Sequence, residues 1–141
     1  MSNALKISEA ASIAMHAMVY LAADTDRKVG VKEIAETLRV SEDHLSKVFQ
    51  RLAHAGLVNS MRGPHGGFAL SRQGGMITLG EVYAAIEGPL TKTKCLLNSP
   101  ICKGGTCILG GLLETVNHEI REYLDKTALT DLISIYDGVK K

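Results

Sequence analysis

Apolar side chains recur with helical spacing in several segments of the chain. The first such pattern covers residues 8–22, where Ser8 is placed to cap a helix and Glu9 lies in its first turn. The polar stretch 24–30 comes next and ends in a glycine, which predicts a turn or loop. The apolar face of the first helix consists of Ile13, Ala14, Ala17, Met18 and Leu21.

Two further helical patterns lie close together. Residues 31–38 carry apolar side chains at i, i+3, i+4 and i+7, which predicts a short amphipathic helix. After a tight break at 39–40, Ser41 is placed to cap a second helix, and Gly56 is placed to end it. The apolar positions of this second helix are Leu45, Val48, Phe49 and Leu52.

Strand spacing replaces helical spacing after the second of these helices. Residues 57–62 and 68–71 are short alternating runs, and the glycine-rich stretch between them predicts a β-hairpin. Two short helices joined by a tight turn and followed directly by a hairpin describe a winged helix-turn-helix. The second helix of such a unit enters the major groove of DNA.

The second half of the chain returns to helical patterns. Thr78 and Glu81 form a capping box, and a Gly–Pro pair at 88–89 ends the helix that they begin. Apolar residues reappear later as a stripe on a long helix over 108–126, and 129–136 predicts a short terminal helix. The stripe consists of Leu109, Leu112, Leu113, Val116, Ile120 and Leu124. It is too narrow and too apolar for an isolated surface helix, which predicts dimerisation through it.

These elements predict a mostly α fold with a small β-hairpin wing, built as a winged helix-turn-helix plus a long dimerisation helix. Residues 1–88 form the DNA-binding domain, and 108–141 form the dimerisation helix and C-terminal segment. Between them, residues 89–107 have no periodicity and contain all three cysteines. A loop of this length is usually functional or disordered.

The polar side of the second helix supplies candidate DNA contacts. At 100° per residue, Asp43, Lys47, Gln50 and His54 fall nearly opposite the apolar positions, flanked by Ser46 and Arg51. Lysine, glutamine, serine and arginine side chains donate to base edges or phosphates, and an aspartate accepts from a cytosine amino group. The alternative interpretation is an ordinary solvated helix face.

The hairpin tip supplies a second set of candidates. Glycines at the tip allow close approach to a phosphate backbone and permit positive φ angles. Arg62 leads into the tip, where its guanidinium can enter a minor groove, and Arg72 comes after the returning strand, where it can touch phosphate. The alternative is a purely structural hairpin. The wing candidates are Arg62, Gly63, His65, Gly66 and Arg72.

Composition sets limits on this interpretation. The 141 residues are 45% hydrophobic, enough for a core, and the net charge of +1 does not itself indicate nucleic-acid binding. An odd number of cysteines argues against a disulfide framework and fits a reducing compartment. The apolar run at 10–23 contains His16 and is too short to span a bilayer. We therefore expect a cytoplasmic protein without membrane contact.

The cysteines have the pattern Cys-x6-Cys-x4-Cys at Cys95, Cys102 and Cys107. Three thiolates within 13 residues can converge on one iron–sulfur cluster or one zinc ion. No Cys-x-x-Cys pair is present, so the spacing is not a familiar zinc signature. From spacing alone, free buried or redox-active thiols are the other interpretation.

Several motifs appear in a fixed order along the chain: Arg62-Gly63, Gly66-Gly67-Phe68, Ile77-Thr78-Leu79, Glu81-Val82 and Glu87-Gly88-Pro89. This ordered set resembles the IscR/NsrR family of bacterial transcription regulators, over roughly residues 6 to 133. The resemblance implies a homodimer that places one recognition helix in each half-site of a palindromic operator on double-stranded DNA. It also implies base contacts around Asp43, His44, Ser46 and Lys47, with Arg62 in the minor groove.

The resemblance also bears on the cysteines, because cluster-binding members of the family carry three cysteines in this loop. It implies a 2Fe–2S or 4Fe–4S cluster that senses cluster supply, nitric oxide or redox state, and that an aerobically prepared sample can lack. The fourth ligand of the family has no direct match in this chain. Gly110 stands where one branch of the family has a histidine, and Ser12 stands at a first-helix position where another branch has a ligand. We take His16 as the candidate fourth ligand. The alternative is that His16 is a histidine packed at the dimer interface, and His118 is a weaker candidate for the fourth ligand.

The sequence therefore predicts a DNA-binding transcription regulator gated by an iron–sulfur cluster. A cluster-free regulator of the same fold, sensing through zinc or thiols, is the alternative. A thiol oxidoreductase acting through Cys102 or Cys107 is a remote alternative, because no resolving pair, cofactor loop or catalytic His–acid constellation appears. We expect that the protein is not an enzyme.

Overall fold

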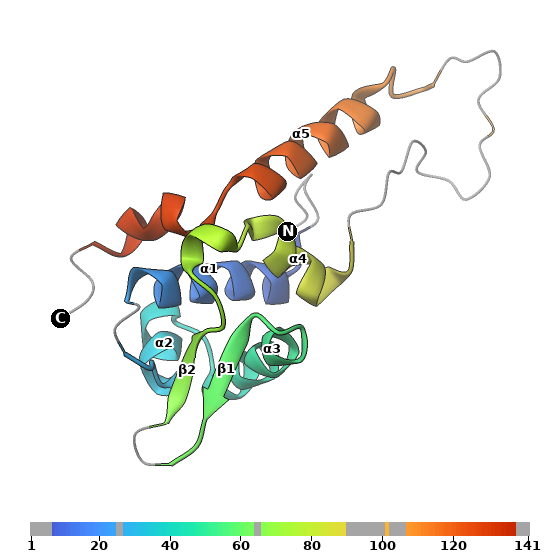
Figure 1. Ribbon diagram of the computed structural model, residues 1–141. Coiled ribbons are helices and arrows are strands. Elements are labelled where there is room, and N and C mark those ends of the chain that lie inside the picture. The colour runs from blue at the N-terminus through green and yellow to red at the C-terminus, as the bar shows by residue number, and fades with distance from the viewer. Residues whose placement is uncertain (1–6, 25–26, 64–65, 90–100, 102–106, 138–141) are drawn as a thin grey trace.

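The computed structural model describes residues 7–24, 27–63, 66–89, 101 and 107–137. Figure 1 shows a helical body, from which the β-hairpin points in one direction and a long C-terminal helix extends in another. Within the described ranges, no helix is long and apolar enough to cross a membrane.

Helix α1 (Glu9–Ala23) lies at the centre of the body. It begins as predicted, because the Ser8 hydroxyl accepts a hydrogen bond of 3.0 Å from the Ala11 amide. Burial extends beyond the single predicted face to Val19, Tyr20 and Ala22. The reason is tertiary: helices from both halves of the chain pack against α1, so most of its circumference is covered.

Helices α2 (Val31–Leu38) and α3 (Glu42–His54) form the predicted helix-turn-helix. Arg39 adopts a left-handed conformation (φ 58°) in the turn, and Ser41 caps α3 through the His44 amide at 3.0 Å. Gly56 (φ 80°) ends α3 in a Schellman motif, with Leu57 N–H bonded to the Leu52 carbonyl at 3.0 Å. The core-facing residues of the pair are Ile34, Ala35, Leu45, Val48, Phe49 and Leu52.

Strands β1 (Val58–Met61) and β2 (Gly67–Leu70) pair antiparallel and form the wing. Val29, in the predicted loop before α2, adds an isolated bridge by exchanging two backbone hydrogen bonds of 2.9 and 3.0 Å with Phe68. The Phe68 ring also stacks on Phe49 of α3, with centroids 4.3 Å apart and planes within 8°. The wing is therefore attached to α3 and to the segment that leads into α2.

A short 3-10 helix, η1 (Gly74–Met76), leads into α4 (Leu79–Glu87). The predicted capping box is present at the start of α4: the Glu81 amide donates to the Thr78 hydroxyl at 3.2 Å, and the Thr78 amide donates to the Glu81 carboxylate at 3.0 Å. Gly88 (φ 81°) comes after the last helical residue, as the Gly–Pro stop predicts.

Helix α5 (Leu112–Lys126) is shorter than the expected helix over 108–126. Residues 108–111 form a turn, because Gly110 (φ 57°) and Gly111 (φ 82°) are left-handed and interrupt the helix. The terminal segment is a 3-10 helix, η2 (Leu129–Tyr136), that packs on α1. The ring of Tyr136 contacts that of Tyr20 edge to face, with ring centroids 5.1 Å apart. The Tyr136 hydroxyl donates a hydrogen bond of 3.0 Å to the His16 carbonyl.

Candidate nucleic-acid interface and cysteine segment

The exposed side of α3 carries the predicted base contacts. Asp43 and Lys47 form an ion pair of 3.3 Å with side chains 83% and 70% exposed, and Gln50 is also exposed. His44 and Ser46 are half-buried beside them. The pair is one helical turn apart and well hydrated, so it holds the two side chains only weakly. Both are available to exchange this contact for one with DNA.

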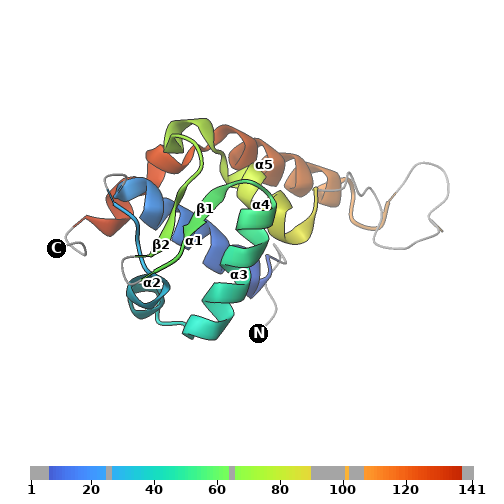
Figure 2. The same cartoon turned by 60° about the horizontal axis from the view of Figure 1, so that its bottom comes forward.

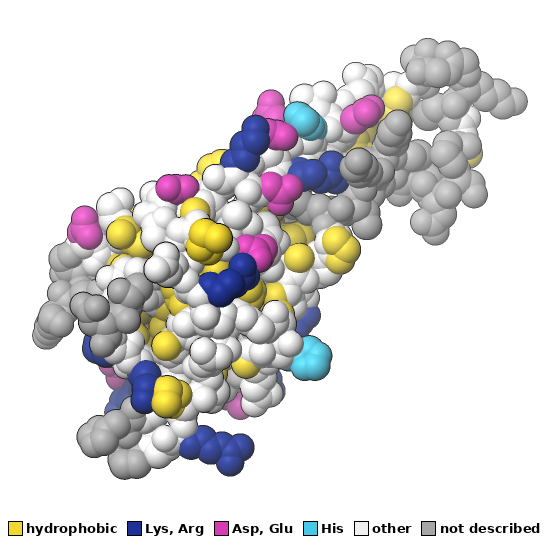
Figure 3. Space-filling model, in the orientation of Figure 1, with side chains coloured by type: hydrophobic (Ala, Val, Ile, Leu, Met, Phe, Trp, Pro, Cys, Tyr) yellow, Lys and Arg dark blue, Asp and Glu magenta, His cyan; other side chains and the backbone are white. Residues whose placement is uncertain are grey.

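The wing tip presents Arg62 and Gly63, which are both exposed. Figure 3 shows several Lys and Arg side chains around this hairpin end of the molecule. Pro64 and His65 lie outside the described residues. The hairpin and α3 lie on the same side of the body (Figure 2). A cation on the hairpin is therefore placed where it can contact the same ligand as the exposed side of α3, as in a winged helix protein bound to DNA.

The two glycines that return from the tip have a further reason to be glycine. A Cβ at Gly66 would overlap the Met61 carbonyl oxygen, and one at Gly67 (φ 154°) would lie 2.5 Å from the Val29 carbonyl oxygen. The sequence pattern predicts that these glycines permit close approach to DNA. In the structure they are required by the close packing of the protein's own backbone.

Two arginines among the candidates are engaged within the protein. Arg72 bonds Glu81 at 2.8 Å and the Met76 carbonyl at 3.2 Å, which joins the end of the wing to α4. Burial raises the pKa of Glu81, but hydrogen bonds from Arg72 and from the Thr78 amide outweigh it, and the net pKa is lowered. Arg51 donates from Nη2 to the Ile86 carbonyl in the last turn of α4.

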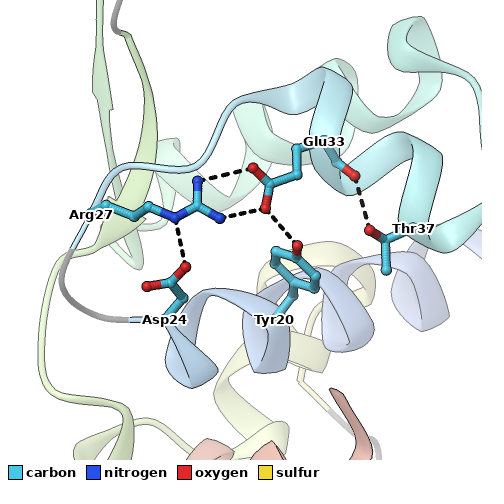
Figure 4. Close-up of polar contacts among 5 residues, drawn as sticks. All are labelled: Tyr20, Asp24, Arg27, Glu33 and Thr37. Atoms are coloured by element: carbon cyan, nitrogen blue, oxygen red, sulfur yellow. Dashed lines mark hydrogen bonds and ion pairs between the residues drawn. The ribbon is translucent and has the colours of Figure 1, made fainter. Parts of the chain in front are cut away.

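A polar network that the sequence pattern does not reveal joins α1 and the loop after it to α2 of the helix-turn-helix (Figure 4). Tyr20 is 2% exposed, and its hydroxyl donates a hydrogen bond of 2.5 Å to the carboxylate of Glu33 in α2. Arg27 binds the same carboxylate through two nitrogens at 2.6 and 2.9 Å, and binds Asp24 at 2.6 Å. Burial, and then the bond to Glu33, raise the pKa of Tyr20. Tyr20 lies within the apolar run of α1, so its polar role has no local signal.

Of the three cysteines, Cys107 lies within the described residues, and Cys95 and Cys102 lie outside them. Cys107 is half-buried at the turn before α5, and its Sγ accepts a hydrogen bond of 3.4 Å from the Leu109 amide. Such N–H···S contacts stabilise a thiolate, so the position fits a metal or cluster ligand. In the part of the chain that the structure describes, no three His, Cys, Asp or Glu side chains gather as a metal site.

His16, the candidate fourth ligand, is exposed on α1. Its Nδ1 lies 2.7 Å from the Ser12 carbonyl oxygen, which can only accept, so Nδ1 carries the proton. Nε2 is then the ring nitrogen with a lone pair for a ligand. His118 is exposed on α5.

An apolar groove of about 440 Å³ lies where α1, α4, α5 and η2 meet. The side chains of Tyr123 and Ile135 on its border are 56% and 53% exposed, and Leu112 further along α5 is 58% exposed. The groove is lined by Ile7, Met15, His16, Val19, Leu79, Glu119, Ile120, Tyr123, Leu124, Leu132 and Ile135.

A tight helix pair, an exposed polar face on its second helix and an attached two-stranded wing define a winged helix-turn-helix transcription regulator. The sequence profile of the Rrf2 family, described as iron-dependent transcriptional regulators, matches residues 7–135. The chain belongs to the Rrf2 family, which confirms the predicted resemblance and fold class.

The similarity to known proteins extends over most of the chain. CymR of Bacillus subtilis is 32% identical over 95% of this chain and 94% of its own. Its structure, described as that of the global cysteine regulator, matches with a TM-score of 0.77 and 30% identity over 92% of this chain and 97% of the other.

Proteins named IscR also match. IscR of Vibrio vulnificus is 32% identical over 92% of this chain and 78% of its own. The T. potens IscR structure has a TM-score of 0.74 at 28% identity, over 98% of this chain and 93% of the other. The curated relatives are named as transcriptional regulators, in agreement with the prediction that the chain is not an enzyme.

Proposed function

We propose that the protein is a dimeric regulator that binds a palindromic operator, with α3 of each protomer in a major groove and Arg62 in the adjacent minor groove. The observation that carries this proposal is the division of α3 into two faces. Leu45, Val48, Phe49 and Leu52 are at most 2% exposed, so the opposite face must meet solvent or a partner. That face displays Asp43, Lys47 and Gln50, whose side chains match base edges and phosphates.

A second copy of the chain is the occupant we propose for the apolar groove and for the exposed stripe of α5. In Figure 1 the N-terminal half of α5 extends beyond the body, while its C-terminal half forms one wall of the groove. A twofold axis across α5 would place each exposed half on the partner's groove, as an isologous contact requires. In this arrangement residues 1–88 bind DNA, 89–107 form the sensing loop and 108–141 join the protomers.

We further propose that Cys95, Cys102 and Cys107, with His16 as the fourth ligand, hold a 2Fe–2S or 4Fe–4S cluster. The N–H···S contact at Cys107 and the protonated Nδ1 of His16 support a ligand role for both. The description of the family as iron-dependent agrees. When bound, such a cluster supplies a redox-sensitive and nitric-oxide-sensitive group. We place the regulator in the cytoplasm, where thiols stay reduced.

A second candidate function is a cluster-free regulator of the same fold, which senses through thiols or zinc. The similarity to CymR, described as a global cysteine regulator, favours it. Three cysteines in one loop serve either function.

Anaerobic purification followed by visible absorption, iron and sulfide analysis separates the two candidates. The proposed function predicts visible cluster absorption and stoichiometric iron and sulfide, whereas colourless protein after reconstitution with iron and sulfide would favour the cluster-free regulator. DNA binding is tested in parallel with a duplex selected by the protein from a randomised library. Fluorescence anisotropy on that duplex should show one dimer per palindrome, and failure to select any duplex would contradict the DNA-binding proposal.

A further inference from the structure

Four residues from three helices meet at the C-terminal end of α4. Arg51, in the last turn of α3, donates to the Ile86 carbonyl, and the hydroxyl of Ser8, the N-cap of α1, donates to the Glu87 carboxylate. We call Ser8, Arg51, Ile86 and Glu87 the helix junction. Helices α3 and α4 lie side by side in both views of the molecule (Figures 1 and 2).

The contact between Arg51 and Ile86 has a clear physical basis. The carbonyls in the last turn of a helix have no amide partner within the helix, and α4 ends at Glu87. The Gly88 amide satisfies Ala84, one turn earlier, at 2.9 Å. A guanidinium at this position bonds the carbonyl of Ile86 and also neutralises the negative end of the helix dipole.

The helix junction lies immediately before the cysteine segment in the chain. Gly88 and Pro89 lead directly from α4 into the stretch that holds the three cysteines. The same end of α4 is thus bonded to the recognition helix on one side and continues into the proposed sensing loop on the other. Any displacement of this end acts on Arg51, and through it on the orientation of α3.

We propose that Arg51 is a positioning residue rather than a DNA contact. It attaches the recognition helix to the end of α4 and transmits the state of the cysteine segment to α3. The transmission from the cysteine segment to α3 rests on the proposed sensing function, whereas the attachment of α3 to the end of α4 does not. This assignment replaces the phosphate or base contact that the helical periodicity of α3 suggested for Arg51.

The attachment is tested by the salt dependence of DNA binding, measured with cluster-free protein and the selected duplex. Each contact between a cationic side chain and a phosphate contributes about −0.9 to the slope of log Kobs against log salt concentration. Lys47→Met should reduce the magnitude of this negative slope by about 0.9. Arg51→Met should weaken binding by about 2- to 30-fold with the slope unchanged. If Arg51→Met reduced the magnitude of the slope as much as Lys47→Met does, the proposal would be overturned.

The transmission is tested by comparing DNA affinity with and without iron–sulfide reconstitution. Gln50→Met is the matched control, because Gln50 is the exposed neighbour of Arg51 on α3. Because Gln50 lies on the face of α3 that we place in the groove, we expect Gln50→Met to weaken DNA binding equally with and without reconstitution and so to keep the wild-type ratio of the two affinities. Arg51→Met should bring that ratio to within about twofold of one. An unchanged ratio in Arg51→Met would overturn the transmission.

Two further controls keep the outcomes distinct. Equal affinities of the two forms in the wild type would refute the sensing function and the transmission together, while the salt slope would still decide the attachment. Thermal unfolding followed by circular dichroism checks that each variant folds. Arg51→Gln, which is also neutral, replaces Arg51→Met in both measurements if the methionine variant does not fold.

Discussion

Gly67→Ala should damage the attachment of the wing to the helix-turn-helix. The added Cβ would lie 2.5 Å from the Val29 carbonyl oxygen and 2.7 Å from its carbonyl carbon, both of which belong to the backbone. Backbone atoms cannot rotate away as the end of a flexible side chain can, so the bridge between Val29 and Phe68 has to open. Gly63→Ala is the matched control, because Gly63 also has a positive φ (106°) but no described atom lies within 4 Å of a Cβ placed there.

The expected magnitudes come from these contacts. Backbone strain at a positive φ costs about 1–2 kcal/mol, and this is the whole effect expected for Gly63→Ala. Gly67→Ala also loses the two backbone hydrogen bonds between Val29 and Phe68, each worth about 0.5–1.5 kcal/mol. We therefore expect a total destabilisation of about 2–5 kcal/mol for Gly67→Ala. DNA affinity should fall as well, because the wing loses its fixed orientation.

Urea unfolding at a fixed protein concentration measures this difference, since the stability of a dimer depends on concentration. Anisotropy with the selected duplex then measures binding in conditions where both variants are folded. If Gly67→Ala were no less stable than Gly63→Ala, to within about 0.5 kcal/mol, the bridge at Val29 would not contribute as we argue.

Arg62→Ala should cost about 1–3 kcal/mol in DNA binding and leave unfolding unchanged, because Arg62 is exposed; an unchanged Kd at moderate salt would reject the minor-groove contact. Replacing Val116 and Ile120 together with Glu should give monomers that do not bind the palindrome, and sedimentation showing wild-type monomers at micromolar concentration would refute the dimer. The pKa of Glu81 is below its ordinary value of 4.5, so its carboxylate stabilises the fold at neutral pH, and this contribution is lost as the pH falls from 4.5 through the lowered pKa. Glu81→Gln should therefore reduce the loss of stability between neutral and acidic pH, and an identical pH profile for variant and wild type would contradict the role of the Arg72 contact. Replacing all three cysteines with Ala should abolish the response to nitric oxide and oxygen, and His16→Ala should make the cluster labile while cluster-free protein still binds DNA; a cluster equally stable in the His16 variant would remove that ligand.

Local sequence alone specifies several features of the fold. The caps at Ser8 and Ser41, the capping box at Thr78 and the stop at Gly56 all appear as predicted. Each depends on hydrogen bonds between residues at most five positions apart, so the local sequence contains the full information. The spacing of apolar residues on α3 was equally sufficient, because four buried positions at helical intervals define which side faces outward.

Contacts between segments that are distant in the sequence depend on tertiary packing. The sequence pattern predicts a loop at Val29, because nothing near this residue in the sequence reveals that it exchanges two backbone hydrogen bonds with Phe68. The same reason applies to the guanidinium groups. Helical periodicity favours a DNA contact for Arg51, and the position after the returning strand favours one for Arg72, but their partners Ile86 and Glu81 come from another helix. A charged side chain has the same pattern in the sequence whether it contacts DNA or a carbonyl of its own fold. Only the tertiary structure, which packs α4 against α3 and brings Glu81 within reach of Arg72, distinguishes the two.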